Sequence, residues 1–137
     1  MNQFPSKNYF SLPSEIFSLR LGAGEIAVYA YLRCLENPST YQCWPSYATI
    51  GKAIGRTKNT VMQYVDALSE KGLISTEPTS VLTKSRIKKN GNLRYTIKPI
   101  HEAVEIFHTR QLSAVERTTE RRQIHRKLSA VNLLPGA

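Results

Sequence analysis

Apolar residues recur at helical spacing in three separate stretches of this chain. In the first, "GEIAVYAYLRCLENP", they fall one, three and four positions apart, which predicts a helix with a wide, largely buried apolar face made of Ala27, Val28, Tyr31, Leu32 and Leu35. The pair Asn37-Pro38 ends this helix. Before it, "LPSEIF" predicts a short helix over about 13–19 that starts at Ser14.

The other two helical stretches lie on either side of Gly55. Ser46 is a good N-cap for a helix over about 46–54, whose apolar side holds Tyr47, Ile50 and Ile54. Gly55 stands where a left-handed residue ends a helix, and Thr57 can cap the next one. The second helix ends at Gly72, and its apolar residues follow the i, i+3, i+4, i+7 template: Val61, Tyr64, Val65 and Leu68.

Two short segments, "LISTE" at 73–77 and "LRYTI" at 93–97, predict strands. The stretch between them is polar and basic, and "NGN" at 90–92 supplies turn chemistry. It therefore predicts a hairpin with a long basic loop whose tip lies at Lys88 and Lys89. "TYQCW" at 40–44 is a further β-prone segment. Tyr41 and Trp44 could stack on bases, but we expect them to pack in the core, because one lies in the expected strand and the other just before a helix start. Pro99 closes this unit.

The pattern changes after residue 100. Val104 and Phe107 offer a packing face, but the residues beyond them are strongly charged with few apolar positions. This predicts a helix after residue 100 and then a tail that is either helical but weakly held, or disordered. The whole chain is predicted to be mostly α with a small β-hairpin and a C-terminal helical extension.

The charge of the chain changes this picture because it is uneven. Lys and Arg number 19 against 10 Asp and Glu, a formal net charge of +9. Residues 56–98 hold nine basic and three acidic residues, a net charge of +6, whereas residues 1–55 hold four and three. Nucleic acid is the usual polyanionic partner of such a patch, and a solvated basic surface is the alternative.

Other classes of function find little support in the sequence. No apolar run approaches the ~20 residues of a membrane helix, and the N-terminus lacks the signal-peptide pattern, so we expect a cytoplasmic protein with no membrane partner. The two cysteines and three histidines lack zinc-type spacing, so we expect no metal site. We also expect no other cofactor and no small-molecule ligand. We expect no enzymatic activity and no catalytic residues, because Gly-rich phosphate loops, HExxH and clustered carboxylates are all missing from the sequence.

Two helices joined by a tight turn that contains Gly form a helix-turn-helix arrangement. Its first helix braces the second, and the second presents its amino-terminal half to the major groove of DNA. Side chains that can read base edges occupy this half, and we expect base contacts from Thr57, Lys58, Asn59, Thr60 and Gln63. Arg56 and the free N–H groups of the helix start suit phosphates. The alternative is the polar outer face of any helical hairpin.

The segments "FSLPSEIF", "GEIAVYAYL", "CWPSYATIGKAIGRTKNTVMQYVDALSEKGLI" and "NLRYTI" resemble the winged helix-turn-helix domains of plasmid, phage and conjugative-element replication initiators and related regulators. The resemblance covers about residues 10–100, between an N-terminal arm at 1–9 and the extension at 101–137. It implies double-stranded DNA binding, with the helix after Gly55 in the groove and the hairpin as the wing. It also implies a transcriptional regulator or a replication-associated protein of a bacterial mobile element.

The same resemblance implies a set of residues at the DNA backbone. Those beside the groove are Ser46, Tyr47, Lys52 and Arg56, and those of the wing are Lys84, Arg86, Lys88, Lys89 and Arg94. Winged helices also serve as protein-docking modules, which is the alternative function. The extension at 101–137 is expected to pack on its own domain or against a second copy, which would make the protein a homodimer.

Overall fold

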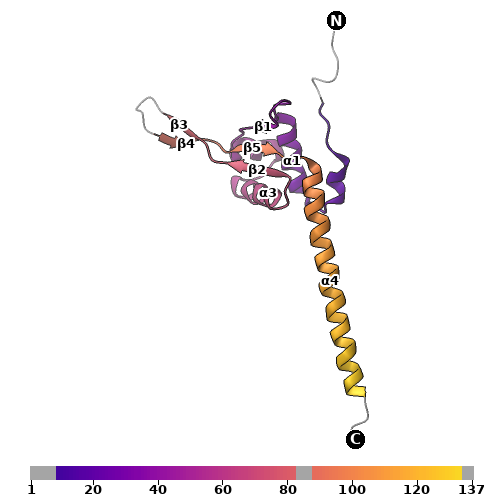
Figure 1. The fold of residues 1–137 in the computed structure, drawn as a ribbon. Helices are drawn as coiled ribbons and strands as arrows, with labels where there is room; N and C mark the ends of the chain where they lie inside the picture. The colour runs from indigo at the N-terminus through magenta and orange to yellow at the C-terminus, as the bar shows by residue number, and fades with distance from the viewer. Residues whose placement is uncertain (1–8, 83–87, 134–137) are drawn as a thin grey trace. The chain divides into compact units, whose positions relative to one another are not determined.

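The computed structural model describes residues 9–82 and 88–133, and the chain falls into two compact units divided between Val104 and Glu105. The helices of the first unit are a 3-10 helix, η2 (Ser14–Ser18), and three α-helices, α1 (Ala23–Leu35), α2 (Tyr47–Ile54) and α3 (Lys58–Glu70). Its strands are β1 (Gln42–Cys43), β2 (Ile74–Glu77), β3 (Ser80–Leu82), β4 (Lys88–Asn90) and β5 (Arg94–Ile97) (Figure 1). The helix α4 (Ile100–Leu133) begins in the first unit and makes up the described part of the second.

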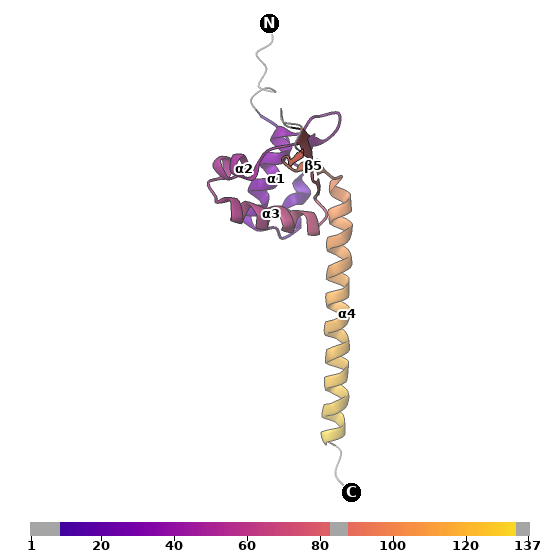
Figure 2. The ribbon, with the colours of Figure 1, turned by 90° about the vertical axis from the view of Figure 1, so that its left-hand side faces the viewer.

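The core of the first unit lies where α1, α2 and α3 meet one another and the sheet (Figure 2). Each element contributes its apolar side, and none of the described polar or charged residues is buried. Burial of these side chains stabilises the fold by the hydrophobic effect, at roughly 1.5–3 kcal/mol for each large one. The most deeply buried large side chains are Tyr29, Tyr95, Ile16, Leu32, Ile50, Leu68, Leu73, Ile74, Val28, Val61 and Val65.

Local capping chemistry fixes the ends of α2 and α3 as the sequence predicts. The Ser46 hydroxyl accepts a hydrogen bond from the Thr49 N–H at 3.0 Å, and the Thr57 hydroxyl accepts one from the Thr60 N–H at 3.3 Å. Gly55 has a φ of 72°, in the left-handed region that glycine tolerates best. These predictions are therefore confirmed.

The predicted short helix at about 13–19 is present as η2, a 3-10 helix whose first residue is Ser14. Pro13 occupies the N-cap position of η2, and no side chain caps this helix. Proline has a fixed φ near −65° that suits entry into a helix, so the backbone of Pro13 favours this start without a side-chain cap.

The five strands found in the described residues form two antiparallel sheets. The larger has the order β1-β5-β2, with Cys43 and Thr76 on either side of Tyr95. The smaller pairs β3 with β4, and Ser80 lies opposite Asn90. The predicted position of the hairpin tip is therefore wrong, because Asn90-Gly91-Asn92 joins β4 to β5 and the connection between β3 and β4 falls at 83–87, outside the described residues. The two sheets are successive parts of one hairpin, interrupted where "NGN" leaves the ladder.

The predictions about burial hold only in part. In α1, Val28 and Leu32 are buried as predicted, but the buried face is turned toward Tyr29, which is 1% exposed, whereas Leu35 at the helix end is 41% exposed. Tyr41 and Trp44 are 53% and 49% exposed rather than in the core. Trp44 directly follows the buried Cys43, and successive side chains along a strand point to opposite faces. Tyr41 stands before β1 with a left-handed φ of 60°, so it does not follow this alternation.

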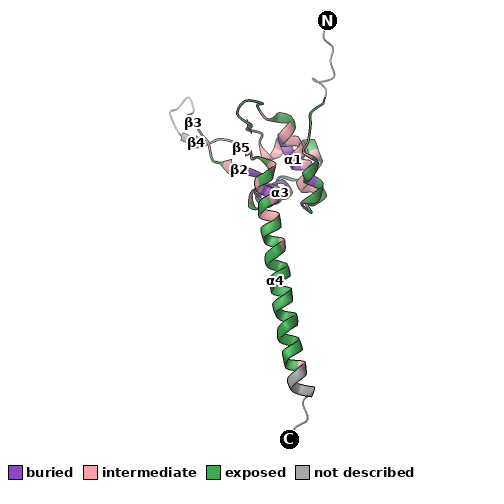
Figure 3. Cartoon of the chain, turned by 45° about the vertical axis from the view of Figure 1, so that its right-hand side comes forward, coloured by how far each residue is buried: buried purple, intermediate pink, exposed green. Residues whose placement is uncertain are grey.

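The predicted helix after residue 100 is present as α4, which extends without interruption to Leu133. Its first turn contributes Ala103 to the buried core, and Val104 and Phe107 are half-buried. Every residue from 112 to 128 is exposed (Figure 3). Over the part of the chain that the structure describes, no helix is long and apolar enough to cross a membrane.

Candidate nucleic-acid interface

A close approach between backbone segments shapes the turn that joins α2 to α3. A Cβ atom on Gly51 would lie 2.5 Å from the carbonyl oxygen of Arg56, which is closer than atoms approach without displacement. The Gly51 carbonyl accepts hydrogen bonds from the N–H groups of Gly55 and Arg56, the latter at 2.9 Å. Gly51 therefore lets the chain fold back tightly before α3 begins. The sequence carried only a weak signal for this role, namely that glycine inside a helix costs stability relative to alanine.

The inner side of α3 holds the helix in one orientation. Its apolar residues Val61, Val65 and Leu68 are buried, and so is Ile50 of α2. Tyr64 packs over Gly24 of α1, where an added Cβ would lie 2.1 Å from the tyrosine ring. An ion pair of 2.6 Å between Lys71 and Glu25 ties the end of α3 to α1. Both ends of α3 are thus fixed from within, and its outer side is left to solvent or a ligand.

The outer side of α3 presents most of the predicted base-reading residues. Lys58, Asn59 and Gln63 are exposed. The hydroxyl groups of Thr57 and Thr60 are hydrogen-bonded to each other at 3.0 Å, and the Thr57 hydroxyl also caps α3. These hydroxyl groups are therefore less available for base contacts than the side chains of Lys58, Asn59 and Gln63. Three further exposed residues of this side were not among those predicted: Met62, Asp66 and Glu70. Their helical spacing from Asn59 is the sequence signal that places them there.

The residues predicted beside the groove differ in how free they are. Ser46 is occupied as the cap of α2. Tyr47 is half-buried, and its pKa is raised by burial and, to a smaller extent, by the negative charge of Asp66. Lys52 and Arg56 are exposed, and the Arg56 guanidinium donates a hydrogen bond of 3.0 Å to the carbonyl of Gly55.

A shallow surface depression brings the cationic residues of this region together. It lies between α2 and the start of α3, and it contains the charged side chains of Lys52, Arg56 and Lys58 among its lining residues. The amino terminus of α3 opens at the same place, because Thr57 and Thr60 line the depression as well. Cationic side chains beside a helix amino terminus favour an anion such as a DNA phosphate.

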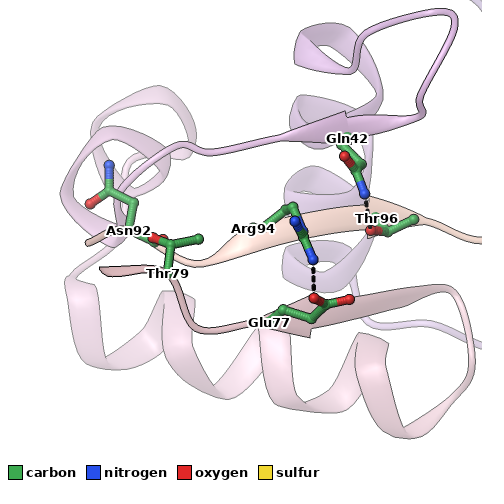
Figure 4. Close-up of polar contacts among 6 residues, drawn as sticks. All are labelled: Gln42, Glu77, Thr79, Asn92, Arg94 and Thr96. Atoms are coloured by element: carbon green, nitrogen blue, oxygen red, sulfur yellow. Dashed lines mark hydrogen bonds and ion pairs between the residues drawn. The ribbon is translucent and has the colours of Figure 1, made fainter. Parts of the chain in front are cut away.

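The predicted wing residues fall into three groups. Lys84 and Arg86 lie at 83–87, outside the described residues. Lys88 and Lys89 belong to β4, whose backbone pairs with Leu82 and Val81 of β3. Arg94 is placed differently, on β5 of the larger sheet, where it forms an ion pair with Glu77 of β2 (Figure 4). The structure therefore does not bring Arg94 into the β3–β4 hairpin, and Glu77 offsets its charge.

Polar contacts fasten the base of the β3–β4 hairpin to the helical part of the domain. The Gly91 N–H donates to the carbonyl of Thr79 at 2.8 Å, and the Thr79 hydroxyl donates to the carbonyl of Asn92. The Asn92 side chain in turn donates to the carbonyl of Trp44 at 3.1 Å, in the connection that leads into α2. Figure 4 shows Thr79 and Asn92 side by side at this junction. The hairpin base and the start of α2 are therefore held together.

Two observations on the described residues concern metal binding and thiol chemistry. Within residues 9–82 and 88–133, no group of three His, Cys, Asp or Glu side chains is placed to hold a metal ion. Burial raises the pKa of the Cys43 thiol to about 11, which makes it a weak nucleophile at neutral pH. The arrangement suits binding through shape, hydrogen bonds and positive charge.

Comparison with known proteins agrees with this geometry. Residues 19–74 match the model of a helix-turn-helix domain. No curated protein sequence matches the chain. A solved structure of a possible transcriptional regulator from Methanosarcina mazei Go1 superposes with a TM-score of 0.53 at 15% identity, over 78% of this chain and 81% of that one.

Two further solved structures are similar at lower scores. A mutant of MepR from S. aureus bound to an oligodeoxyribonucleotide gives a TM-score of 0.45 at 19% identity, over 85% of this chain and 81% of that one. A regulator of the MarR family from Silicibacter pomeroyi gives 0.42 at 16% identity, over 89% and 79%. The predicted fold class is confirmed: residues 19–74 form a helix-turn-helix domain within a winged-helix fold that carries a C-terminal helix.

Proposed function

We propose that this protein binds double-stranded DNA with sequence preference and acts as a transcriptional regulator. The observation that carries the proposal is the exposure of Lys58, Asn59 and Gln63 on the outer side of α3. The tight turn at Gly51 fixes the position where this helix begins. Lysine donates to guanine, and Asn and Gln side chains pair with adenine, so these residue types suit the major groove.

Positive charge around this surface supports DNA over a docked protein. Residues 56–98 carry a net charge of +6, from nine basic and three acidic residues, and three cations line the depression beside α3. A winged helix that docks a protein has no need for such a surface, whereas DNA binding draws much of its affinity from phosphate neutralisation. The proposed backbone contacts are Lys52 and Arg56 beside the groove, and Lys88 and Lys89 in the wing.

Replacing a single base-reading residue tests the proposal. The Gln63→Ala variant is expected to lose ~1–3 kcal/mol of binding free energy on the preferred duplex and much less on a shuffled duplex. Gln123→Ala, which removes the same side chain from an exposed position of α4, is the matched control and should bind both duplexes like the unchanged protein. Fluorescence anisotropy with labelled duplexes measures both. Equal losses of Gln63→Ala on the two duplexes would contradict base reading by α3.

The resemblance to replication initiators extends the proposal: the protein is cytoplasmic and binds the DNA of a bacterial mobile element, either as a regulator or as a replication protein. Recovery of bound DNA from cells, followed by footprinting, separates these two roles. A site beside the promoter of its own gene supports a regulator. A cluster of repeated sites in a replication origin supports a replication protein.

A homodimer through residues 101–137 is the second part of the proposal, with residues 10–100 as the DNA-binding domain. Residues 112–128 of α4 are exposed and include four large apolar side chains: Leu112, Val115, Ile124 and Leu128. Two copies reading two half-sites would multiply the discrimination available to one short helix. Sedimentation of the full chain and of a chain shortened to end at Pro99 tests this. If both sediment as monomers at micromolar concentration, with and without DNA, the extension does not dimerise.

A further inference from the structure

The outer side of α3 changes character along its length. Its first turns carry Lys58, Asn59 and Gln63, whereas its last turns carry Asp66 and Glu70. Asn59, Gln63 and Asp66 follow the spacing i, i+4, i+7, so they form one row on the same face of the helix. A carboxylate therefore stands in line with the proposed base-reading side chains.

Asp66 is unusual in the sequence around it. Between Glu36 and Asp66 the chain contains no Asp or Glu, although this stretch includes all of α2 and the turn. Asp66 is exposed, and it makes no hydrogen bond or ion pair with the residues that the structure describes. Glu77, the next acid after Glu70, is by contrast neutralised by Arg94. An acidic side chain without a partner thus remains on the face that should approach a polyanion.

The negative charge of Asp66 also acts on Tyr47 of the neighbouring helix α2. It contributes to raising the pKa of Tyr47, second to the effect of burial. Tyr47 lies at the start of α2, beside the proposed phosphate contacts of Lys52 and Arg56. A phosphate placed near Tyr47 would therefore lie in the field of a carboxylate, which disfavours binding unless DNA offers that carboxylate a donor.

We propose that Asp66 is a specificity-determining residue of the DNA binding proposed above: its carboxylate accepts a hydrogen bond from the N4 amino group of a cytosine in the preferred site and opposes binding to sequences that lack it. Asp and Glu accept from this amino group in the major groove, where the other bases present different patterns. A site without the cytosine leaves the carboxylate desolvated and unpaired near phosphates, so the wrong sequence is penalised.

The position of Asp66 in the row is compatible with reading a base next to that of Gln63. The helix rises about 1.5 Å per residue, which separates the two residues by roughly 4.5 Å along its axis. Successive base pairs are about 3.4 Å apart, so the two side chains would address neighbouring or next-neighbouring pairs. Glu70 lies a further turn along and is the natural control, since its replacement removes the same charge farther from the bases.

Binding-site selection from a randomised duplex library tests the inference. Asp66→Asn removes the charge but keeps the shape of the side chain, and Glu70→Gln does the same one turn later. We expect Asp66→Asn to bind a shuffled duplex roughly three- to tenfold more tightly, and its preference for the selected duplex over the shuffled one to fall roughly tenfold. One position of the enriched sequence should lose its cytosine, since Asn pairs with adenine. Glu70→Gln should enrich the same sequence as the unchanged protein.

Three results would overturn the inference. In the first, Asp66→Asn enriches the same bases with the same preference as the unchanged protein. In the second, both variants gain affinity equally for every duplex, which would make Asp66 a plain surface charge. In the third, Asp66→Asn melts at a lower temperature and weakens binding to both duplexes equally, which would make it a structural partner of Tyr47. If the unchanged protein itself enriches no duplex, the proposed function fails as well, so the two failures are distinguishable.

Discussion

Leu68 and Leu128 are the same residue in the two regions of this protein, and they have opposite surroundings. Leu68 of α3 is 0% exposed, within a core that every helix of the first unit helps to build. Leu128 of α4 is 58% exposed, in a stretch where every residue from 112 to 128 faces solvent. Both segments are helical, so the comparison separates the formation of a helix from the packing that stabilises it. Most helical stability in proteins comes from an apolar face that is buried.

The apolar residues of α4 do not form one face. Leu112 and Val115 lie one turn apart, and so do Ile124 and Leu128. The nine positions from Val115 to Ile124 correspond to about two and a half turns, so the two pairs lie on opposite sides of the helix. In α3 a single row of buried residues faces one core. A partner of α4 would therefore have to cover two sides, which a simple two-stranded coiled coil does not do.

The largest expected effect comes from the same substitution made in both regions. Leu68→Ala should lower the free energy of unfolding by ~2–5 kcal/mol, because it leaves a cavity in a packed core. Leu128→Ala should change the free energy of unfolding of the monomer by no more than about 0.5 kcal/mol, as substitutions at exposed positions usually do. Urea unfolding of the full chain at one fixed protein concentration measures both.

Repeating the urea unfolding of Leu128→Ala at several protein concentrations shows why a large loss of stability would occur, if one is found. If Leu128→Ala also costs several kcal/mol, and the loss grows with protein concentration, a second copy buries Leu128 in solution. If it costs as much at every concentration, Leu128 packs within its own chain and the contrast between the two regions is wrong.

A smaller effect is expected from introducing alanine into a helix in each region. Gly to Ala in a helix normally stabilises, but Gly51→Ala should cost ~1–3 kcal/mol because its new Cβ meets the Arg56 carbonyl oxygen at 2.5 Å. Ser113→Ala, at an exposed position of α4, should instead stabilise by a few tenths of a kcal/mol through helix propensity. Thermal unfolding followed by circular dichroism measures both signs. A gain in stability for Gly51→Ala would show that the turn relaxes around a methyl group.

These contrasts also show which features the sequence contains. Helix ends were predictable because their causes are local: Ser46 and Thr57 cap with their own hydroxyls, and Gly55 adopts its left-handed conformation whatever lies far away. The two strands of the hairpin were predictable from their residue types. The exposure of Lys58 and Asn59 followed from helical periodicity, while their role in reading bases stays a prediction.

What the sequence did not determine depends on contacts between distant segments. The burial of Tyr29 in place of Leu35 is set by how α1 is rotated against the other helices. The exposure of Trp44 depends on which residue of a two-residue strand faces inward. Asn90-Gly91-Asn92 forms the base of the β3–β4 hairpin and not its tip, because strand pairing continues beyond it from β2–β5 to β3–β4. The Gly91 N–H accordingly donates to the carbonyl of Thr79 and does not close a turn.

The smallest expected effect concerns salt dependence and compares two pairs of cations. Replacing Lys88 and Lys89 of β4 with Ala should flatten the slope of log affinity against log salt by about 2 units, because each phosphate contact contributes about 0.9. Between 0.05 and 0.2 M salt, the fall in affinity should therefore shrink about tenfold. Replacing Arg121 and Arg122 of α4 with Ala removes the same charge from exposed positions and should leave the slope unchanged.

Fluorescence anisotropy with one duplex over a series of salt concentrations measures the slopes of all three proteins. An unchanged slope for the lysine variant would mean that the hairpin points away from the duplex, and the wing would lose its proposed role. A slope that flattens equally for the arginine variant would mean that α4 also follows a phosphate backbone. In that case DNA would be the partner that the exposed surface of α4 lacks, and the two regions would share one ligand despite their different packing.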